Sequence, residues 1–206
     1  MVFPITVVGI GPGHKDYLLP AAVTAVQRSD YLMGGPRALA LFSHLNKPQH
    51  VIDGDIQGTV HKLELLRKEY KVAVLVSGDP GFYSMLNYLK RHFTEEEIKV
   101  IPGISSMQLA FARIGRPWQD AVFFSVHGRP LTGLAEIVRP GRVVAVLTDK
   151  HHNPGVIACF LRDKVQGDPM VYVCDHLGTE MEDISVTNLS RVETKATNSV
   201  MVICYE

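Results

Sequence analysis

The sequence predicts an α/β protein of two lobes, the first with a mostly parallel sheet and the second with a mixed sheet. Short apolar runs rich in β-branched residues alternate with stretches of helical periodicity through the first half of the chain. Strand-like runs then cluster toward the C-terminus, which is typical of antiparallel hairpins added to a mixed sheet. The stretch 116–120 has no periodicity and contains a helix-breaking proline, so we place the boundary there, between lobes at 1–117 and 118–206.

The first lobe begins with a buried strand that ends in glycines, and its clearest strand is the run VAVLV at 72–76. That run is bounded by a Tyr-Lys pair and by a Ser-Gly-Asp-Pro turn, which fixes its length. The expected strands of this lobe are 5–10, 31–33, 50–52, 72–76 and 99–101. The expected helices are 20–28, 37–45, 58–69, 81–92 and 104–114.

The second lobe contains another strongly apolar strand, VVAVL at 143–147, and becomes mainly strand after its second helix. Its expected strands are 122–126, 143–147, 170–174, 184–186 and 200–204. Its expected helices are 131–138 and 154–162. No internal repeat or long linker interrupts the pattern.

Composition excludes several classes of protein. Lys+Arg and Asp+Glu number 21 each, and this zero net charge argues against a general nucleic-acid binder. The apolar N-terminus lacks a basic region and a cleavage site, and no apolar run approaches 18 residues, so we expect a cytoplasmic protein without a membrane span. The three cysteines, Cys159, Cys174 and Cys204, are widely spaced in apolar runs, which predicts buried reduced thiols and no zinc site.

The first chemical signal is the turn Gly9-Ile10-Gly11-Pro12-Gly13, directly after a buried strand. Glycines there let the backbone turn sharply and approach a ligand. A dinucleotide fingerprint would need a third glycine where His14 stands, and Pro12 removes an amide that a phosphate cradle would use. Asp30 also precedes the next strand, whereas a ribose-binding acid ends it. Taken alone, the turn fits a tight strand-to-helix connection as well as a ligand loop.

Two further glycine turns follow strands, in SGDPGFYS at 77–84 and in IPGISS at 101–106. Ligands of open α/β sheets bind at the carboxyl ends of the strands. Asp79 can accept hydrogen bonds from ribose hydroxyls or an amino group, or it can simply form an Asx turn before proline. Ser105 or Ser106 can cap the next helix, which is compatible with ligand contact. Because no P-loop lysine, nucleophile elbow or HExxH pair accompanies the turns, they suggest a nucleoside held by backbone groups and one carboxylate.

The motifs GIGPG, SGDPGFYS and IPGISS, at this spacing, resemble those of the tetrapyrrole methylase family of class III S-adenosylmethionine-dependent enzymes. The resemblance runs from Thr6 to about Val202. The stretches GGPR at 34–37, SVHGR at 125–129 and LGTE at 177–180 look like the precorrin carbon-5 branch. This implies two α/β lobes with S-adenosylmethionine in the cleft between them, usually in a homodimer.

Carried onto this chain, the resemblance implies a set of binding residues. Those on the cofactor side would be Gly78, Asp79, Gly81, Phe82, Tyr83, Ser105, Ser106, Leu147, Thr148 and Leu177. Those on the substrate side would begin with Gly9, Gly11, Pro12 and Gly13. The substrate carries many carboxylates, for which planar guanidinium groups are suited. The candidate arginines are Arg37, Arg113, Arg116 and Arg129, each of which could instead form a surface salt bridge.

The expected reaction is methylation of carbon 5 of cobalt-precorrin-7, of its metal-free counterpart or of precorrin-6Y, in cobalamin biosynthesis. An electron-rich ring carbon can attack the sulfonium methyl directly, so positioning would be the main task. His127 is the candidate base for any ring proton. The paired His151 and His152 are expected in an exposed loop and not as metal ligands. Since the chain ends at Glu206, we expect the carbon-15 methylation and decarboxylation to belong to a separate partner.

Three alternatives stay open. One is methylation at another tetrapyrrole position, or of a diphthamide precursor, on the same fold. A second is a non-catalytic nucleotide-sensing module, against which the three intact loops argue. The third is a nicotinamide-dependent reductase, disfavoured by His14 and Asp30. Binding of S-adenosylhomocysteine but not NAD separates the third from the others.

Overall fold

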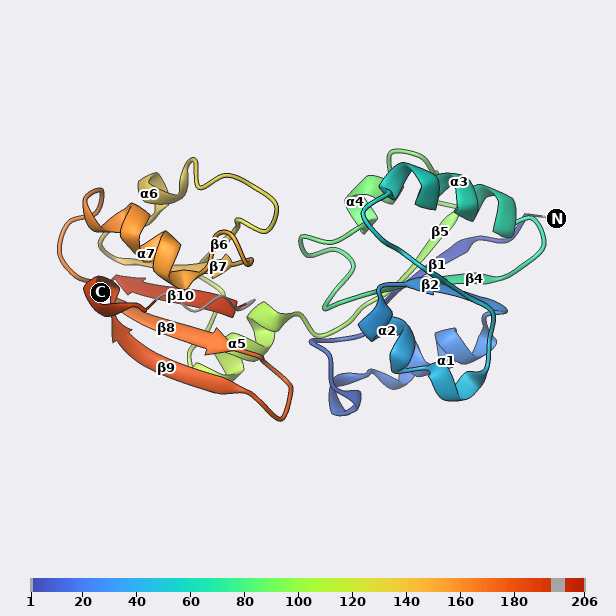
Figure 1. Cartoon of the computed structure of the whole chain (residues 1–206), viewed down its shortest axis with the longest axis horizontal. Helices are drawn as coiled ribbons and strands as arrows, with labels where there is room; N and C mark the ends of the chain where they lie inside the picture. The colour runs from blue at the N-terminus through green and yellow to red at the C-terminus, as the bar shows by residue number, and fades with distance from the viewer. Residues whose placement is uncertain (1, 194–198, 206) are drawn as a thin grey trace. The chain divides into compact units, whose positions relative to one another are not determined.

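The structure is a computed structural model that describes residues 2–193 and 199–205. The chain divides into two compact units, Met1–Ser105 and Ser106–Glu206 (Figure 1). This division falls earlier than the boundary that we expected at 117. Helix α5 (Ser106–Ile114) contacts strand β10 (Ser199–Tyr205), which places it in the second unit.

The first unit is a five-stranded, fully parallel sheet between two layers of helices. The strands lie in the order β3-β2-β4-β1-β5. Their bounds are β1 (Ile5–Gly9), β2 (Tyr31–Gly34), β3 (Gln49–Val51), β4 (Val72–Val76) and β5 (Ile98–Ile101). The helices are α1 (Pro20–Arg28), α2 (Pro36–Ala40), α3 (Ile56–Leu66) and α4 (Leu86–Leu89), with 3₁₀ turns at Lys15–Tyr17 and Ser43–Leu45.

Strand β4 is buried along its whole length because helices cover both faces of the sheet. Val72, Val74 and Val76 pack with residues of α3 and α4, while Ala73 and Leu75 pack with residues of α1 and α2. The alternation follows from the two-residue period of a strand. Figure 1 shows α3 and α4 on one face and α1 and α2 on the other.

The second unit is a mixed five-stranded sheet in the order β6-β7-β10-β8-β9. Strands β6 and β7 are parallel, and the remaining neighbours are antiparallel. Besides α5 and β10, its elements are β6 (Val122–Ser125), α6 (Leu134–Ile137), β7 (Arg142–Leu147), α7 (Pro154–Arg162), β8 (Met170–Asp175), β9 (Asp183–Asn188) and a 3₁₀ turn at Leu189–Arg191. The predicted parallel and mixed sheets are therefore both confirmed.

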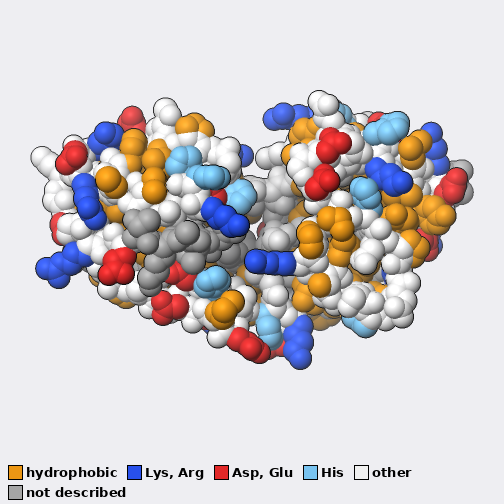
Figure 2. All heavy atoms as spheres, in the orientation of Figure 1, with side chains coloured by type: hydrophobic (Ala, Val, Ile, Leu, Met, Phe, Trp, Pro, Cys, Tyr) orange, Lys and Arg blue, Asp and Glu red, His pale blue; other side chains and the backbone are white. Residues whose placement is uncertain are grey.

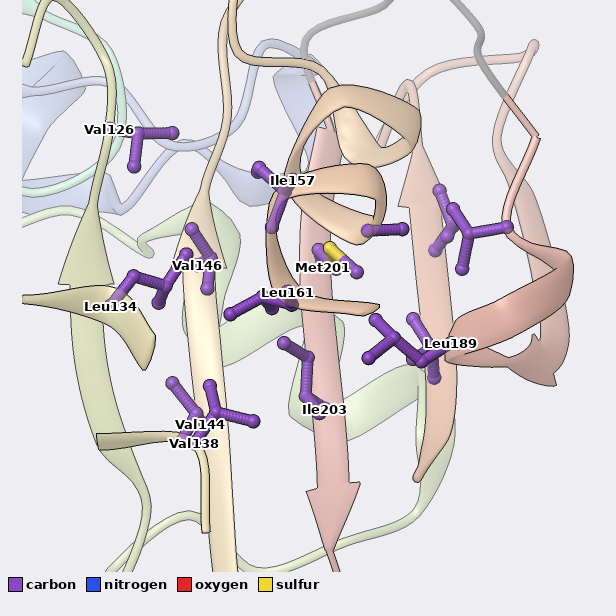
Figure 3. Close-up of a cluster of buried hydrophobic side chains, with 14 residues drawn as sticks. Val126, Leu134, Val138, Val144, Val146, Ile157, Leu161, Leu189, Met201 and Ile203 are labelled. Carbon is purple, nitrogen blue, oxygen red and sulfur yellow. The ribbon is translucent and has the colours of Figure 1, made fainter. Parts of the chain in front are cut away.

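One face of the second sheet holds the core that Figure 3 shows. Met201 and Ile203 of β10 meet Ile157 and Leu161 of α7, and all four side chains are fully buried. Val144, Val146, Leu134 and Leu189 extend the same cluster across the sheet. A nine-residue helix thus anchors the strand that joins the parallel and antiparallel halves.

Two predicted helices are much shorter than expected. The segment 81–92 forms a helix only at α4, and 131–138 forms one only at α6. Tyr83 has φ +49° and Gly133 has φ +85°, and neither conformation continues a right-handed helix. Similarly, the helix expected over 37–45 ends with α2 at Ala40.

The cysteine prediction is wrong at one position. Cys174 and Cys204 are buried, but Cys159 lies on the exposed face of α7. Burial, reinforced by the nearby carboxylates of Asp175 and Glu182, raises the pKa of the Cys174 thiol to about 12. Separately, no helix among the described residues is long and apolar enough to cross a membrane.

Candidate active site

Three glycine loops meet at one edge of the first sheet. They follow β1, β4 and β5, which are neighbours in the parallel sheet, so their carboxyl ends lie together. The first and second loops are joined directly. The Gly78 amide donates to the Gly11 carbonyl at 2.8 Å, and the Gly11 amide donates to the Gly78 carbonyl at 3.3 Å. The loops are therefore joined by a short antiparallel bridge beyond the parallel strands.

Asp79 joins the second loop to the third. Its Oδ1 accepts from the Gly81 amide at 2.8 Å, and its Oδ2 accepts from the Gly103 amide at 3.1 Å. The first of these bonds is the Asx turn that the sequence suggested as the simpler interpretation. Each carboxylate oxygen has more than one lone pair, so these bonds leave acceptor capacity for a ligand. Asp79 therefore holds the second and third loops together through bonds within the protein.

The loops approach one another so closely that only glycine fits at two positions. A Cβ on Gly103 would lie 2.2 Å from the Gly78 carbonyl oxygen. A Cβ on Gly9 would lie 2.6 Å from the Gly103 amide nitrogen and 2.7 Å from the same Gly78 oxygen. Both contacts are with backbone, which cannot rotate away as a side chain would. These glycines therefore set the spacing of the three loops.

The second loop also holds a non-glycine residue in the left-handed conformation. Tyr83 has φ +49°, and its ring meets that of Phe82 edge-on at 4.9 Å between centroids. A bulky residue at positive φ costs free energy that the surrounding structure must offset. Such residues concentrate at functional sites, which fits the cofactor-side role expected for both aromatic residues.

The remaining predicted residues of this unit lie near the same edge. A Cβ on Gly78 would lie 3.5 Å from the Cα of Ser105, which precedes α5 directly. Pro12 and Gly13 continue the first loop, and Gly13 is exposed. Arg37 is exposed on α2, just past the carboxyl end of β2. The sequence thus located the loop cluster, and the structure adds the bonds within it.

The second unit has its own polar cluster at the carboxyl ends of β6 and β7. Asp149 is buried there and accepts three backbone amides, from Gly128 at 2.8 Å, His151 at 2.8 Å and His152 at 2.7 Å. Burial by itself would raise the pKa of Asp149, but these three hydrogen bonds outweigh it and hold the pKa below its ordinary value. One carboxylate therefore fastens the loop after β6 to the loop after β7.

His127 lies in the first of these loops and is exposed. Its Nδ1 is 3.5 Å from the Thr148 carbonyl oxygen. Since a carbonyl only accepts, this contact favours the tautomer with the proton on Nδ1. Nε2 is then the nitrogen that can accept a proton.

The remaining residues expected on the cofactor side lie at the same edge of the second sheet. Leu147 ends β7, and Leu177 follows β8 and is buried. The Thr148 hydroxyl is occupied within the protein, since it donates to the Ser199 carbonyl and accepts from the Ser199 amide, both at 2.9 Å. The Ser199 hydroxyl in turn donates to the buried Asp175 carboxylate.

Two of the candidate arginines, Arg113 and Arg116, make defined contacts within the second unit. Arg113 Nε donates to Glu182 Oε1 at 2.5 Å, and Glu182 also accepts from the Gly178 amide at 2.7 Å. Burial acts to raise the pKa of Glu182, but Arg113 and the amide together lower it. The Arg116 guanidinium lies over the Tyr172 ring at 5.8 Å. Arg129 is the exposed candidate that adjoins the Asp149 cluster.

Sequence reasoning missed Asp149 and Asp175, the two buried carboxylates of this edge. A signal for Asp149 was present, because it stands two residues past an apolar strand, much as Asp79 follows β4. The paired histidines were expected in an exposed loop, which holds for His151, whereas His152 is partly buried. No group of three or more potential metal ligands occurs in the described ranges.

Glycine loops at the carboxyl edge of a parallel sheet, followed by a mixed-sheet unit, define an α/β protein of two units. Residues 4–193 match the Tetrapyrrole (Corrin/Porphyrin) Methylases, and the chain belongs to this family. The cobalt-precorrin-7 C(5)-methyltransferase of Salmonella typhimurium is 33% identical over 202 residues, covering 98% of this chain and 99% of that protein.

Solved structures show the same fold. The precorrin-6Y methylase (cbiE) from Archaeoglobus fulgidus aligns with a TM-score of 0.76 at 23% identity, over 98% of each chain. The uroporphyrin-III C-methyltransferase from Thermus thermophilus, in complex with S-adenosylhomocysteine, aligns with a TM-score of 0.75 at 18% identity, over 98% of this chain and 92% of that chain.

Proposed function

We propose that this chain is an S-adenosylmethionine-dependent methyltransferase acting on carbon 5 of a cobalt-precorrin or of its metal-free counterpart, in cobalamin biosynthesis. The observation that carries the proposal is the cluster of three glycine loops, locked by Asp79 and by the close approach of Gly9, Gly78 and Gly103. The named activity of the Salmonella typhimurium relative supports the choice of carbon 5. We further expect a homodimer and a separate partner for the carbon-15 chemistry.

The residues present suit a nucleoside cofactor without a phosphate. The loops offer backbone donors and acceptors and small side chains, and Asp79 retains acceptor capacity. Gly78, Asp79, Gly81 and the aromatic pair Phe82 and Tyr83 would hold its methionine and ribose portions, with Ser105 and Ser106 beside them. Leu147, Thr148 and Leu177 would border the adenine. When bound, S-adenosylmethionine supplies a methyl group on a sulfonium leaving group.

The work of the protein is then mainly positioning. Holding two reactants in the correct orientation can lower the activation free energy of such a reaction by about 7–11 kcal/mol. Rigid loops suit that task, and the bridge between Gly11 and Gly78 supplies the rigidity. His127, with Nε2 as the acceptor, would remove the proton displaced from the ring carbon, a step worth a factor of about 10²–10⁴.

Calorimetric titration with S-adenosylhomocysteine tests the proposal. We expect saturable binding near one equivalent per chain and no binding of NAD. A folded protein that binds neither, or that binds NAD alone, would contradict the assignment. Transfer of a methyl group to other tetrapyrroles but not to the carbon-5 substrate would instead move the chain to another branch of the same fold.

Asp79→Ala is expected to weaken S-adenosylhomocysteine binding by about 10-fold or more, because the third loop loses its tie to the second. Asp79→Asn keeps one acceptor oxygen and should therefore lose less affinity for S-adenosylhomocysteine than Asp79→Ala. Calorimetry measures both affinities, and circular dichroism checks that each variant is folded. Glu64→Ala removes an exposed carboxylate from α3 and serves as the matched control. Equal affinities for Asp79→Ala and this control would remove Asp79 from the site.

A further inference from the structure

The loop that joins β8 to β9, residues 176–182, carries one of the residues that we expect beside the cofactor, Leu177. Leu177 and Gly178 are buried, while the free end of the loop is exposed, and Figure 2 shows acidic side chains there. His176 has φ +49° and Gly178 has φ +75°, so left-handed residues stand on both sides of Leu177. A non-glycine residue in that conformation costs free energy, so other contacts must hold the loop in this shape.

The Glu182 carboxylate supplies two of these contacts. Its Oε2 accepts from the Gly178 amide at 2.7 Å, which closes the loop on itself. Its Oε1 accepts from Arg113 Nε at 2.5 Å. Arg113 lies in the last turn of α5, the helix that contacts β10. One carboxylate thus connects the residue after Leu177 to a helix that packs on the sheet.

This ion pair differs from an ordinary surface pair. Exposed pairs contribute little, because solvent screens the charges and both side chains lose conformational freedom. The Arg113 side chain is 38% exposed, but that of Glu182 is only 20% exposed and also binds a backbone amide. Burial by itself would raise the pKa of Glu182, but Arg113 and the Gly178 amide outweigh it and hold the pKa below its ordinary value. The carboxylate is therefore ionised at neutral pH and keeps both bonds.

We propose that Arg113 and Glu182 are positioning residues for the cofactor, in which Glu182 sets the place of Leu177 beside the adenine ring and Arg113 acts through Glu182. The proposal rests on the proposed function. It gives Arg113 a role on the cofactor side, in place of the substrate contact that the sequence suggested. A binding residue keeps its geometry only when its supporting residues are fixed, and a loop depends on such support more than a helix or strand does.

Two ligands that differ by the base alone test the assignment. S-adenosylhomocysteine carries adenine, and S-ribosylhomocysteine is the same molecule without it. We expect Glu182→Ala to weaken S-adenosylhomocysteine binding by about 10-fold or more, measured by calorimetry, and S-ribosylhomocysteine binding by less than about 2-fold. Glu180→Ala removes an exposed carboxylate from the same loop and should change either affinity by less than about 2-fold.

Further variants separate positioning from a general loss of folding, which circular dichroism monitors in each. Glu182→Gln keeps an oxygen for the Gly178 amide but loses the charge that pairs with Arg113, so it should recover most of the affinity. Arg113→Met leaves the Gly178 bond in place and should weaken S-adenosylhomocysteine binding by only about 3-fold. Adding Arg113→Met to Glu182→Ala should weaken binding no further, because Arg113 acts through Glu182.

Three results would overturn the inference and leave the proposed function standing. The first is an S-adenosylhomocysteine affinity of Glu182→Ala equal to that of Glu180→Ala. The second is an equal loss of affinity for the ligands with and without the base, which would indicate a general disturbance of the second unit. The third is an additive loss in the double variant, which would give Arg113 a separate role. A folded wild-type chain that does not bind S-adenosylhomocysteine would overturn the proposed function and the inference together.

Discussion

Replacing Gly103 by alanine is expected to lower the melting temperature of the first unit by about 10 °C or more and to abolish S-adenosylhomocysteine binding. The added Cβ would lie 2.2 Å from the Gly78 carbonyl oxygen and 2.7 Å from the Gly9 carbonyl carbon. Neither atom can move unless the end of a strand moves with it. The clash must therefore separate the third loop from the other two.

Gly54→Ala is the matched control, because a Cβ at that position meets nothing within 4 Å and requires no unusual backbone conformation. Thermal unfolding followed by circular dichroism, together with calorimetry, compares the two variants. If Gly103→Ala melted at the same temperature as Gly54→Ala and still bound S-adenosylhomocysteine, the close approach of the loops would be unnecessary for the fold and the site.

Asp149→Ala is expected to destabilise the second unit by about 3 kcal/mol. It leaves three backbone amides, those of Gly128, His151 and His152, without their charged acceptor in a buried place. Chemical denaturation measures the loss, and Asp163→Ala, which removes an exposed carboxylate just past α7, is the control. If Asp149→Ala lost no more unfolding free energy than Asp163→Ala, the role of Asp149 in holding the two loops together would be contradicted.

The contribution of Asp149 should also depend on pH in a defined direction. Its pKa in the folded protein lies below the ordinary value of 3.8, so the folded state favours the ionised form. The resulting stability is fully present above the unfolded pKa and is lost as pH falls through the lower, folded pKa. The difference in unfolding free energy between wild type and Asp149→Ala should therefore be constant above about pH 5 and shrink below about pH 4. A difference that grew on acidification would contradict the assigned shift.

The sequence predicted most of the strands and the longer helices, because apolar periodicity over many residues is a strong signal. It failed where one residue in a left-handed conformation interrupts a predicted helix, as Tyr83 does before the start of α4. Periodicity cannot show a single backbone angle. It also could not show that β10, the last strand, lies between β7 and β8, because strand order depends on long-range pairing.

The sequence likewise predicted the loops of the candidate site but not the bonds that join them. Glycine turns after strands can be read locally, and the adjacency of β4, β1 and β5 then brings the loops together. The bond from the Gly103 amide to Asp79 joins residues 24 positions apart, and no local pattern encodes it. Asp149 escaped notice for a related reason, since its role depends on an amide 21 positions earlier in the chain.

The uneven burial of the three cysteines leaves the protein with one site for selective chemical labelling. The Cys174 thiol, with a pKa of about 12, stays protonated at neutral pH, and Cys204 is buried. Cys159 is exposed on α7, about 9 Å along the helix from Asn153. A maleimide dye should therefore attach at this position without removal of any native cysteine. It would sit on the helix whose first turn follows the loop held by Asp149, where an environment-sensitive fluorophore can report changes in that loop.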